Sequence, residues 1–326
     1  MHIAIVTDKS YLAWSATTIA SCAVAWTRPG LCVHVLHSPD VGVVERRRLE
    51  AMVGDLGAAT EFHPVDESMV SALPSKGQGL GGRMSWVRVL LPQLLPELDR
   101  VVYLDGDTLI VDAVEDLWAL PLGDAPVAAV ANVTDPPMYP HVESLGIEDP
   151  KSYFNAGVLV VNLRRWREEA ATSSLIRFVT ARTQPLPWFD QDALNAVFAG
   201  RWMPLHPRWN AMNSLWTWGP LAVGVFGDER VRSATTHPVI LHFEGPTICK
   251  PWHYLCEHPW RGEYRTMLHR TPWADTALED RTLATRLIAL LPRHRRVEAF
   301  VRLERARKRS ATMRGRLTSR APADST

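Results

Sequence analysis

The stretch that decides the fold is VVYLDGDTLIV at residues 101–111, where an apolar, β-branched run leads into two aspartates separated by one glycine. A buried strand ending here presents both carboxylates at its C-terminal edge. Residues i and i+2 of extended backbone point to the same side, about 6.6 Å apart, so Asp105 and Asp107 could share one cation. Gly106 lets the backbone turn and a ligand phosphate approach. Carboxylate oxygens favour Mg²⁺, Ca²⁺ or Mn²⁺, although such a stretch is by itself often a plain turn.

Strands and helices alternate ahead of this stretch. Apolar runs predict strands at 2–7, 31–37 and 60–65, and helical spacing predicts helices at 12–26 and 43–56. The alternation predicts an α/β fold with a mainly parallel central sheet flanked by helices. Ligands of such sheets bind beyond the carboxyl ends of the strands, where Asp8 and the pair Asp105/Asp107 fall.

The later segments continue this pattern. Further strands are expected at 127–133, 158–162 and 240–245, and helices are expected from Ser85 and around 190–195. The polar, proline-interrupted residues 134–152 are expected to form a loop over the site. The glycine-rich residues 77–82 have no preceding strand and no following lysine, so we interpret them as a flexible loop and not as a phosphate loop.

Composition is that of a globular enzyme. Apolar residues make up 46% and charged residues 22% of the 326 residues, which argues against disorder. The net charge of +1 is uneven, because residues 293–320 carry eleven Lys/Arg against two Glu, so the remainder is acidic. The four cysteines form no C-x-x-C pair, and neither a signal peptide nor a membrane-spanning run is evident. A cytoplasmic location is expected.

Five blocks of the sequence resemble the retaining glycosyltransferases of family 8, which include glycogenin and bacterial lipopolysaccharide galactosyl- and glucosyltransferases. The blocks are AIVTDKSY (4–11), VRVLLPQLLPELDRVVYLDGDTLIVD (87–112), YFNAGVLVVNLRRW (153–166), DQDALN (190–195) and HFEG with KPW (242–252). Together they span nearly all of residues 1–262. The resemblance implies a Rossmann-like GT-A domain over 1–262 and transfer of a hexose, galactose or glucose, from a UDP-sugar with retention at the anomeric carbon.

The resemblance assigns Asp105, Asp107 and His242 as ligands of Mn²⁺, with Mg²⁺ as a second possibility. A divalent cation is needed there because it neutralises charge that develops on the departing diphosphate. A single histidine after a strand is more often a buried core residue, so the assignment of His242 depends on its block.

Donor-binding residues are implied in the same way. Asp8 and Tyr11 match positions that hold the uracil and ribose, and Asp8 could also be the N-cap of the first helix. Arg88 would contact the donor through its bidentate cation, and Asn155 would bind sugar hydroxyls. Asn132 stands where related sequences often carry an aspartate, which leaves the identity of the sugar open.

The last block places Gly245 and Lys250 at the donor, with Lys250 supplying positive charge to the departing diphosphate. Residues 246–249 separate the two, whereas the family leads us to expect about two residues, so the closing loop is longer.

Asp190 and Gln191 are the candidate catalytic residues, because their block faces the reacting sugar in the family. Asp190 could act as a nucleophile or stabilise positive charge, while Gln191 offers an amide oxygen but is a poor nucleophile. Retention requires either two inversions or departure and attack on one face. We favour front-face transfer, with the leaving phosphate helping to deprotonate the acceptor.

Residues 263–326 are expected to form a basic, largely helical tail. Its apolar positions Val297, Phe300 and Val301 have helical spacing. Such a helix suits the anionic inner face of a membrane and hence a lipid-linked acceptor; a solvated tail or an acidic partner is equally open. Nucleic-acid binding is not expected, since the basic run lacks interleaved aromatics. The acceptor is a glycan, a lipid-linked sugar or a small molecule.

Two other functions are weighed. A haloacid dehalogenase-like phosphohydrolase also carries Asp-x-Asp after a strand, but it needs a threonine four residues after the first aspartate, whereas Thr108 is three residues on. A non-catalytic sugar-nucleotide-binding protein would be favoured only if Asp107, Asp190 or His242 were missing.

Overall fold

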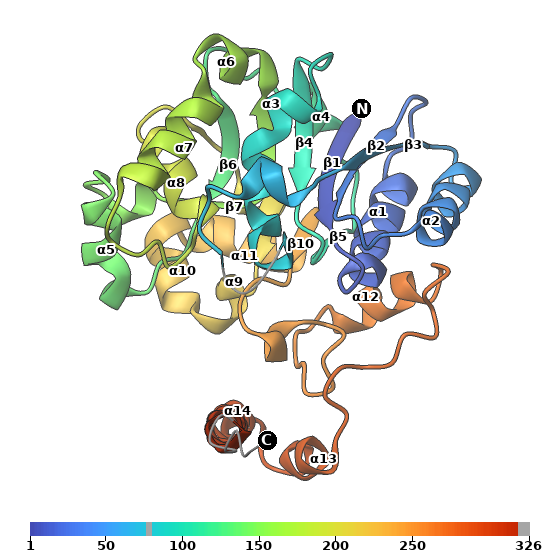
Figure 1. Ribbon diagram of the computed structural model, residues 1–326, viewed down its shortest axis with the longest axis vertical. Helices are drawn as coiled ribbons and strands as arrows, with labels where there is room; N and C mark the ends of the chain where they lie inside the picture. The colour runs from blue at the N-terminus through green and yellow to red at the C-terminus, as the bar shows by residue number, and fades with distance from the viewer. Residues whose placement is uncertain (76–79, 319–326) are drawn as a thin grey trace, which may run out of the picture. The chain divides into compact units, whose positions relative to one another are not determined.

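The computed structural model describes residues 1–75 and 80–318 (Figure 1). Residues 77–79 of the expected glycine-rich loop therefore lie outside the described residues. The chain forms two compact units: Met1–Glu244 with Gly262–Thr276, and Gly245–Arg261 with the described residues from Ala277 onward. The expected boundary after residue 262 stays a prediction.

The first unit is built on a seven-stranded sheet with the strand order β3-β2-β1-β4-β7-β6-β8. Its strands are β1 (His2–Thr7), β2 (Cys32–His37), β3 (Ala59–Pro64), β4 (Arg100–Leu104), β6 (Val127–Ala131), β7 (Phe154–Asn162) and β8 (Met203–Pro204). Neighbouring strands are parallel except that β7 runs antiparallel to β4 and β6. The predicted α/β fold with a mainly parallel central sheet is confirmed.

The chain also forms a second sheet of three strands, in the order β5-β10-β9. It contains β5 (Thr108–Ile110), β9 (Ala211–Met212) and β10 (Ile240–His242). The predicted strand ends at Leu104, just before the two aspartates. The extended backbone expected from Asp105 to Asp107 is wrong, because the Thr108 amide donates to the Asp105 carbonyl at 3.2 Å and this turn divides the stretch between two sheets. The antiparallel register pairs His242 with Thr108, so the turn brings His242 close to the two aspartates.

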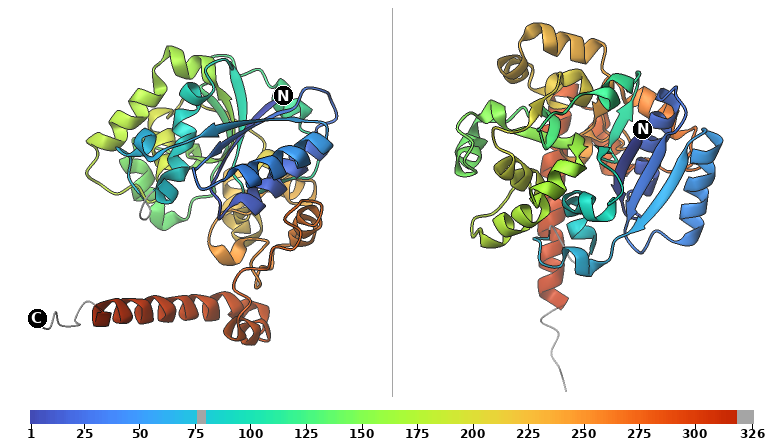
Figure 2. Two further views of the ribbon diagram at one scale, coloured as in Figure 1. Left: turned by 45° about the vertical axis from the view of Figure 1, so that its right-hand side comes forward. Right: turned by 90° about the horizontal axis from the view of Figure 1, so that it is seen from above.

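Helices cover both faces of the large sheet (Figure 2). The helices of the described residues up to Thr276 are α1 (Leu12–Ala25), α2 (Val43–Asp55), α3 (Leu91–Leu94), α4 (Glu115–Ala119), α5 (Tyr139–Ser144), α6 (Leu163–Glu168), α7 (Ala171–Ala181), α8 (Asp190–Val197), α9 (Ser214–Thr217), α10 (Gly219–Phe226), α11 (Asp228–Thr236) and α12 (Arg261–Leu268). Alternate strand residues pack on opposite sides: Ile3 and Ile5 join the core of α1 and α2, and Ala4 joins the core of α6 and α7.

Two local predictions need correction. The helix expected from Ser85 begins earlier, at Leu80, as the 3-10 helix η2 (Leu80–Leu90), which passes into α3. The loop expected at 134–152 contains α5 and two 3-10 turns, each with a proline in its first two positions. Proline favours the first turn of a helix because its φ is already helical and its missing N–H would be unpaired there.

The second unit contains η6 (Thr247–Cys249), α13 (Leu283–Ala289) and α14 (Arg293–Thr318). The predicted helical tail is confirmed. Its small core joins Ile248, Leu255, Ile288 and Phe300, so only Phe300 of the expected apolar stripe is buried, while Val297 and Val301 are 57% and 38% exposed. Among residues 1–75 and 80–318, no helix is long and apolar enough to cross a membrane.

Candidate active site

The three predicted metal ligands converge where the chain leaves the large sheet. Asp105 follows β4, Asp107 precedes β5, and His242 ends β10. His242 Nε2 lies 3.3 Å from Asp107 Oδ1 and 3.9 Å from Asp105 Oδ2. One donor atom from each residue lies within 4.8 Å of the others. The geometry therefore brings two carboxylates and one imidazole around a single point.

Neighbouring side chains orient the Asp105 carboxylate. Its Oδ1 accepts hydrogen bonds from Tyr103 Oη at 2.8 Å and from Arg88 Nη2 at 2.9 Å. Burial raises the pKa of Tyr103 well above its ordinary value, so the phenol stays protonated and can donate. With Oδ1 held in this way, Oδ2 is the oxygen on the side of His242.

The imidazole of His242 is fixed by an asparagine that the sequence did not single out. His242 Nδ1 is 2.9 Å from Asn210 Oδ1, and Asn210 Nδ2 donates to Asn155 Oδ1 at 2.8 Å. With Nδ1–H donating to Asn210, Nε2 presents its lone pair toward Asp107, as a metal ligand requires. Burial alone would lower the pKa of His242, but the carboxylates of Asp107 and Asp105 raise it overall.

Two glycines allow this packing. A Cβ on Gly157 would lie 2.7 Å from Nδ1 and 2.8 Å from Nε2 of His242, so only glycine leaves room for the ring. A Cβ on Gly106 would lie 2.5 Å from Ser15 Oγ and 3.0 Å from a ring carbon of Tyr11. The close neighbours of Gly106 are thus side chains at the start of α1, and the approach of a ligand phosphate at this residue stays a prediction.

Arg88 links Asp105, a candidate metal ligand, to the candidate catalytic residue Asp190. Its Nε lies 2.7 Å from Asp190 Oδ2, its Nη2 contacts Asp105, and its Nη1 donates to the Ala156 carbonyl. The guanidinium also stacks 4.5 Å above the ring of Tyr103. Burial would lower the pKa of Arg88, but Asp105 and Asp190 more than offset this and raise it. Arg88 is therefore a buried, permanently charged bridge.

The charges of this group fit a divalent metal. Asp105 and Asp190 pair with the guanidinium of Arg88, and Asp107 lies beside His242, so three carboxylates share one arginine. Like charges at this separation disfavour ionisation unless a cation compensates them. A divalent ion would balance the excess of about two negative charges and would find hard oxygen donors beside one imidazole.

Asp190 begins α8, as expected, and follows a strained residue. Phe189 has φ 50° and ψ −116°, a backbone conformation that residues other than glycine rarely adopt. The next side chain, Gln191, is held against β7: its Oε1 accepts from the Ala156 amide at 2.9 Å and its Nε2 donates to Tyr153 Oη at 3.2 Å. The backbone thus turns sharply to set both side chains at the edge of the sheet.

Asn155 and Asn132 extend the amide chain from His242. Asn155 Oδ1 also accepts from the Gly157 amide at 2.9 Å, and its Nδ2 donates to Asn132 Oδ1 at 3.4 Å. Asn132 Nδ2 in turn contacts Thr134 Oγ1 at 3.3 Å. Both predicted donor-binding amides therefore lie in one hydrogen-bonded series with His242, the candidate metal ligand.

Asp8 and Tyr11 lie together beyond β1. Asp8 Oδ1 accepts from Ser10 Oγ at 2.6 Å and from the Tyr11 amide at 2.9 Å. Because Tyr11 is itself the N-cap residue of α1, the interpretation of Asp8 as the helix N-cap is wrong; its carboxylate closes the turn ahead of the helix.

Gly245 and Lys250 belong to the second unit. Gly245 has φ 92°, a conformation that favours glycine. The longer loop between them forms η6. Their contact with the donor stays a prediction.

Asn210, Gly157 and Tyr103 are the site residues that sequence reasoning missed. Gly157 carried a usable signal, because a glycine inside an apolar strand often marks the close approach of another group. Asn210 lies in the 3-10 helix η5 (Pro207–Asn210) and has no periodic context.

The sheet topology, with two aspartates beyond β4, defines a GT-A glycosyltransferase. The fold matches the structure of the galactosyltransferase LgtC in complex with donor and acceptor sugar analogs, with a TM-score of 0.73 and 24% identity, over 83% of this chain and 96% of that chain. The sequence profile of Glycosyl transferase family 8 matches residues 2–256. The chain belongs to this family of glycosyltransferases.

Two relatives illustrate the breadth of the family. General stress protein A of Bacillus subtilis (strain 168) is 29% identical over 232 residues, covering 70% of this chain and 79% of the relative. Lipopolysaccharide 1,2-glucosyltransferase of Escherichia coli (strain K12) is 29% identical over 202 residues, covering 61% of this chain and 57% of the relative. Glycosyltransferases of this fold use a nucleotide sugar, a divalent metal and a glycan acceptor.

The phosphohydrolase alternative is not favoured. Besides the family match, Thr108 is fully buried and its Oγ1 donates to the Asp105 carbonyl at 2.9 Å. Its hydroxyl therefore stabilises the turn between the aspartates and is not presented to a phosphate.

Proposed function

We propose that this chain transfers galactose or glucose from a UDP-sugar to a glycan, lipid-linked or small-molecule acceptor, with Mn²⁺ as the metal and retention at the anomeric carbon. The observation that carries the proposal is the group of Asp105, Asp107 and His242 at the end of β4, in a chain of family 8. The names of the glucosyltransferase relative and of LgtC support these two hexoses. Mg²⁺ is the second candidate metal.

Asp105, Asp107 and His242 would hold the metal, which when bound neutralises charge on the departing diphosphate. The protein supports this role through groups that orient the ligands: Tyr103 and Arg88 hold Asp105, and Asn210 holds His242. Because these partners are already in place, little reorganisation is needed when the donor binds.

Residues on either side of Asp105, Asp107 and His242 would recognise the donor. Asp8 and Tyr11 would bind the nucleoside at the end of β1, while Asn132 and Asn155 would meet the sugar. Since each guanidinium nitrogen of Arg88 contacts a protein oxygen, we infer that Arg88 serves the donor by orienting Asp105 and Asp190. Gly245 and Lys250 would contribute to donor binding, with Lys250 supplying positive charge to the departing diphosphate.

The ion pair between Arg88 and Asp190 favours front-face transfer. A carboxylate held 2.7 Å from a guanidinium is a weaker nucleophile, because its charge is already stabilised. Asp190 would then stabilise positive charge on the sugar, with the Gln191 amide beside it. The bond from the anomeric carbon to the phosphate oxygen breaks, the acceptor oxygen bonds on the same face, and the acceptor proton passes to the leaving phosphate.

The second unit suits a peripheral contact with the cytoplasmic face of a membrane. Leu283, Leu287 and Leu290 are 75%, 59% and 81% exposed, and α14 carries the basic run. Exposed leucines beside basic residues are typical of helices that bind anionic bilayers. Co-sedimentation with vesicles containing phosphatidylglycerol tests this contact: Leu287→Asn should bind less than wild type, and equal binding would contradict it.

Calorimetric titration with UDP, with and without Mn²⁺, tests the donor and the metal together. We expect Mn²⁺-dependent binding that is lost in Asp107→Asn and kept in the exposed control Asp55→Asn. Product formed from UDP-galactose or UDP-glucose should retain the anomeric configuration in its proton NMR coupling. UDP binding that ignores Mn²⁺ and Asp107, or an inverted product, would refute the proposal.

A further inference from the structure

A second cluster of possible metal ligands lies on the face of the large sheet, apart from the active site. His34 is in β2, while Glu61 and His63 are in the neighbouring edge strand β3. The parallel register places His34 opposite Glu61, and Leu36 opposite His63. Residues two apart in a strand share a face, so all three side chains meet on one side of two adjacent strands.

The distances between their donor atoms match a zinc site. His34 Nδ1 is 3.1 Å from His63 Nε2 and 3.4 Å from Glu61 Oε2, and His63 Nε2 is 3.9 Å from the same Oε2. Tetrahedral ligands at about 2.1 Å from Zn²⁺ lie about 3.4 Å from one another. The three atoms therefore form a triangle of the size that one zinc ion can span.

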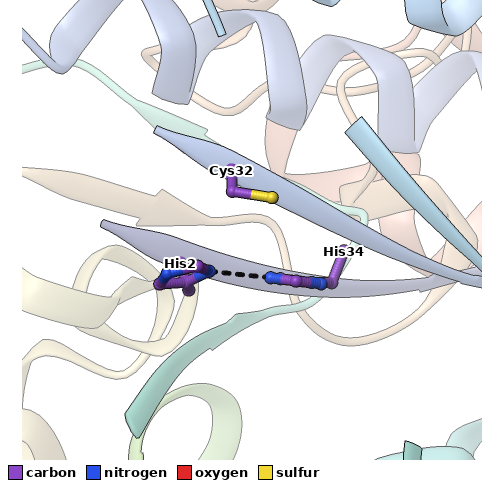
Figure 3. Close-up of side chains that lie close together, drawn as sticks. All are labelled: His2, Cys32 and His34. Atoms are coloured by element: carbon purple, nitrogen blue, oxygen red, sulfur yellow. Dashed lines mark hydrogen bonds between the residues drawn. The ribbon is translucent and has the colours of Figure 1, made fainter. Parts of the chain in front are cut away.

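Surrounding groups orient two of these ligands. His34 Nε2 lies 2.9 Å from His2 Nδ1 on β1, and Figure 3 shows the two rings facing each other. When Nε2–H donates to His2, the lone pair of His34 Nδ1 points toward Glu61 and His63. The other oxygen of Glu61 accepts from Cys32 Sγ at 3.6 Å, which leaves Oε2 on the histidine side. A histidine ligand whose second nitrogen is hydrogen-bonded is typical of metal sites.

The protonation and exposure of the cluster also suit metal binding. Burial lowers the pKa of His34 to about 4 and lowers those of His2 and His63, so the rings are neutral near pH 7. The Glu61 side chain is 58% exposed, whereas that of His34 is 2% exposed. An ion can therefore reach the buried imidazole from solvent by way of Glu61.

We propose that His34, Glu61 and His63 form a zinc site, with its fourth position open to water. Such an ion would join the edge strand β3 to β2, and it would add to the stability of the sheet because it binds only the folded chain. The proposal is independent of the transfer activity, since none of the three residues contacts the group of Asp105, Asp107 and His242.

The neighbouring set His2, Cys32 and His34 is the competing donor set. In this structure the Cys32 thiol donates to Glu61 Oε1 at 3.6 Å, so its hydrogen is directed at the glutamate of the proposed site. Cobalt substitution separates the two sets, because a thiolate ligand produces an intense charge-transfer band that nitrogen and oxygen ligands lack.

Zinc titration of the full chain against a chromophoric chelator tests the site. In an Asp107→Asn background, zinc binding at the active-site group is weakened. One equivalent of zinc should then remain bound, at the proposed site. Adding His63→Gln or Glu61→Gln should remove that equivalent, whereas the exposed control His237→Gln should keep it. In the same background, zinc should raise the melting temperature of Asp107→Asn and not that of the double variant Asp107→Asn with Glu61→Gln.

His2→Ala should keep the equivalent but weaken zinc binding by about 10- to 100-fold, because His2 only orients His34. Unchanged stoichiometry and affinity in both His63→Gln and Glu61→Gln would overturn the proposal. So would a background that binds no zinc, or a thiolate band in the cobalt form.

Discussion

Replacing Gly157 by alanine tests whether room for the His242 ring controls metal binding. The added Cβ would lie 2.7 Å and 2.8 Å from the two ring nitrogens, whereas non-bonded atoms rest about 3.5 Å apart or more. The Cβ would lie closer still to Cε1 of the ring, so the enclosed ring, 3% exposed, would have to move by more than about 1 Å, which would lengthen its 2.9 Å contact with Asn210. We expect Mn²⁺ affinity to fall by about 10- to 100-fold and stability by about 1–3 kcal/mol.

The assay is calorimetric titration of Mn²⁺ in the presence of UDP, together with chemical denaturation. Gly54→Ala is the matched control, since its Cβ would meet nothing within 4 Å in α2. This substitution should raise the free energy of unfolding by about 0.5–1 kcal/mol. Gly157→Ala with wild-type Mn²⁺ affinity would refute the reasoning, because the ring could then keep its ligand geometry despite the methyl group.

Three further changes follow from particular contacts. Asn210→Ala should weaken Mn²⁺ binding by about 10- to 100-fold in the same titration, because it frees His242 Nδ1. Arg88→Lys should lower kcat and the melting temperature, since one ammonium cannot replace three contacts; exposed Arg164→Lys is the control. Burial lowers the pKa of His258 to about 4, so the unfolded chain binds the extra proton below about pH 6.5. The free energy of unfolding should therefore decrease as the pH falls from about 6.5 toward about 4. In this window His258→Gln should reduce the dependence of the free energy of unfolding on pH by about 1.4 kcal/mol per pH unit; an unchanged slope would contradict this.

Local periodicity predicted most of the large sheet. The expected strand 2–7 matches β1, and 31–37 matches β2 within one residue, because buried parallel strands are continuous apolar runs bounded by turns. The division of 101–111 between two sheets could not be predicted in this way. Thr108–Ile110 is buried and would look the same whether it continued β4 or began a new strand, and its partner β10 lies some 130 residues away in the chain.

The site was predictable only as far as its side chains belong to recognisable blocks. The meeting of Asp105, Asp107 and His242 is consistent with the expectation from those blocks. The burial of Arg88 was not foreseeable, because arginine is seldom buried unless paired, and its partners Asp105 and Asp190 are distant in sequence. Asn210 could not be identified from the sequence, because an amide residue in a short 3-10 helix belongs to no periodic pattern.

The two clusters of metal ligands differ in chemistry, and this difference bears on metal choice. Zinc generally binds a given set of nitrogen and oxygen ligands more tightly than manganese. Two carboxylates and an imidazole therefore cannot by themselves prefer Mn²⁺. Diphosphate oxygens from the donor would enlarge this set toward the octahedral, oxygen-rich geometry that suits manganese and not tetrahedral zinc. Selectivity for Mn²⁺ should then appear only with UDP present, so the ratio of Mn²⁺ to Zn²⁺ affinities in a His63→Gln background should rise on adding UDP; a ratio that UDP leaves unchanged would place the selectivity in the protein ligands alone.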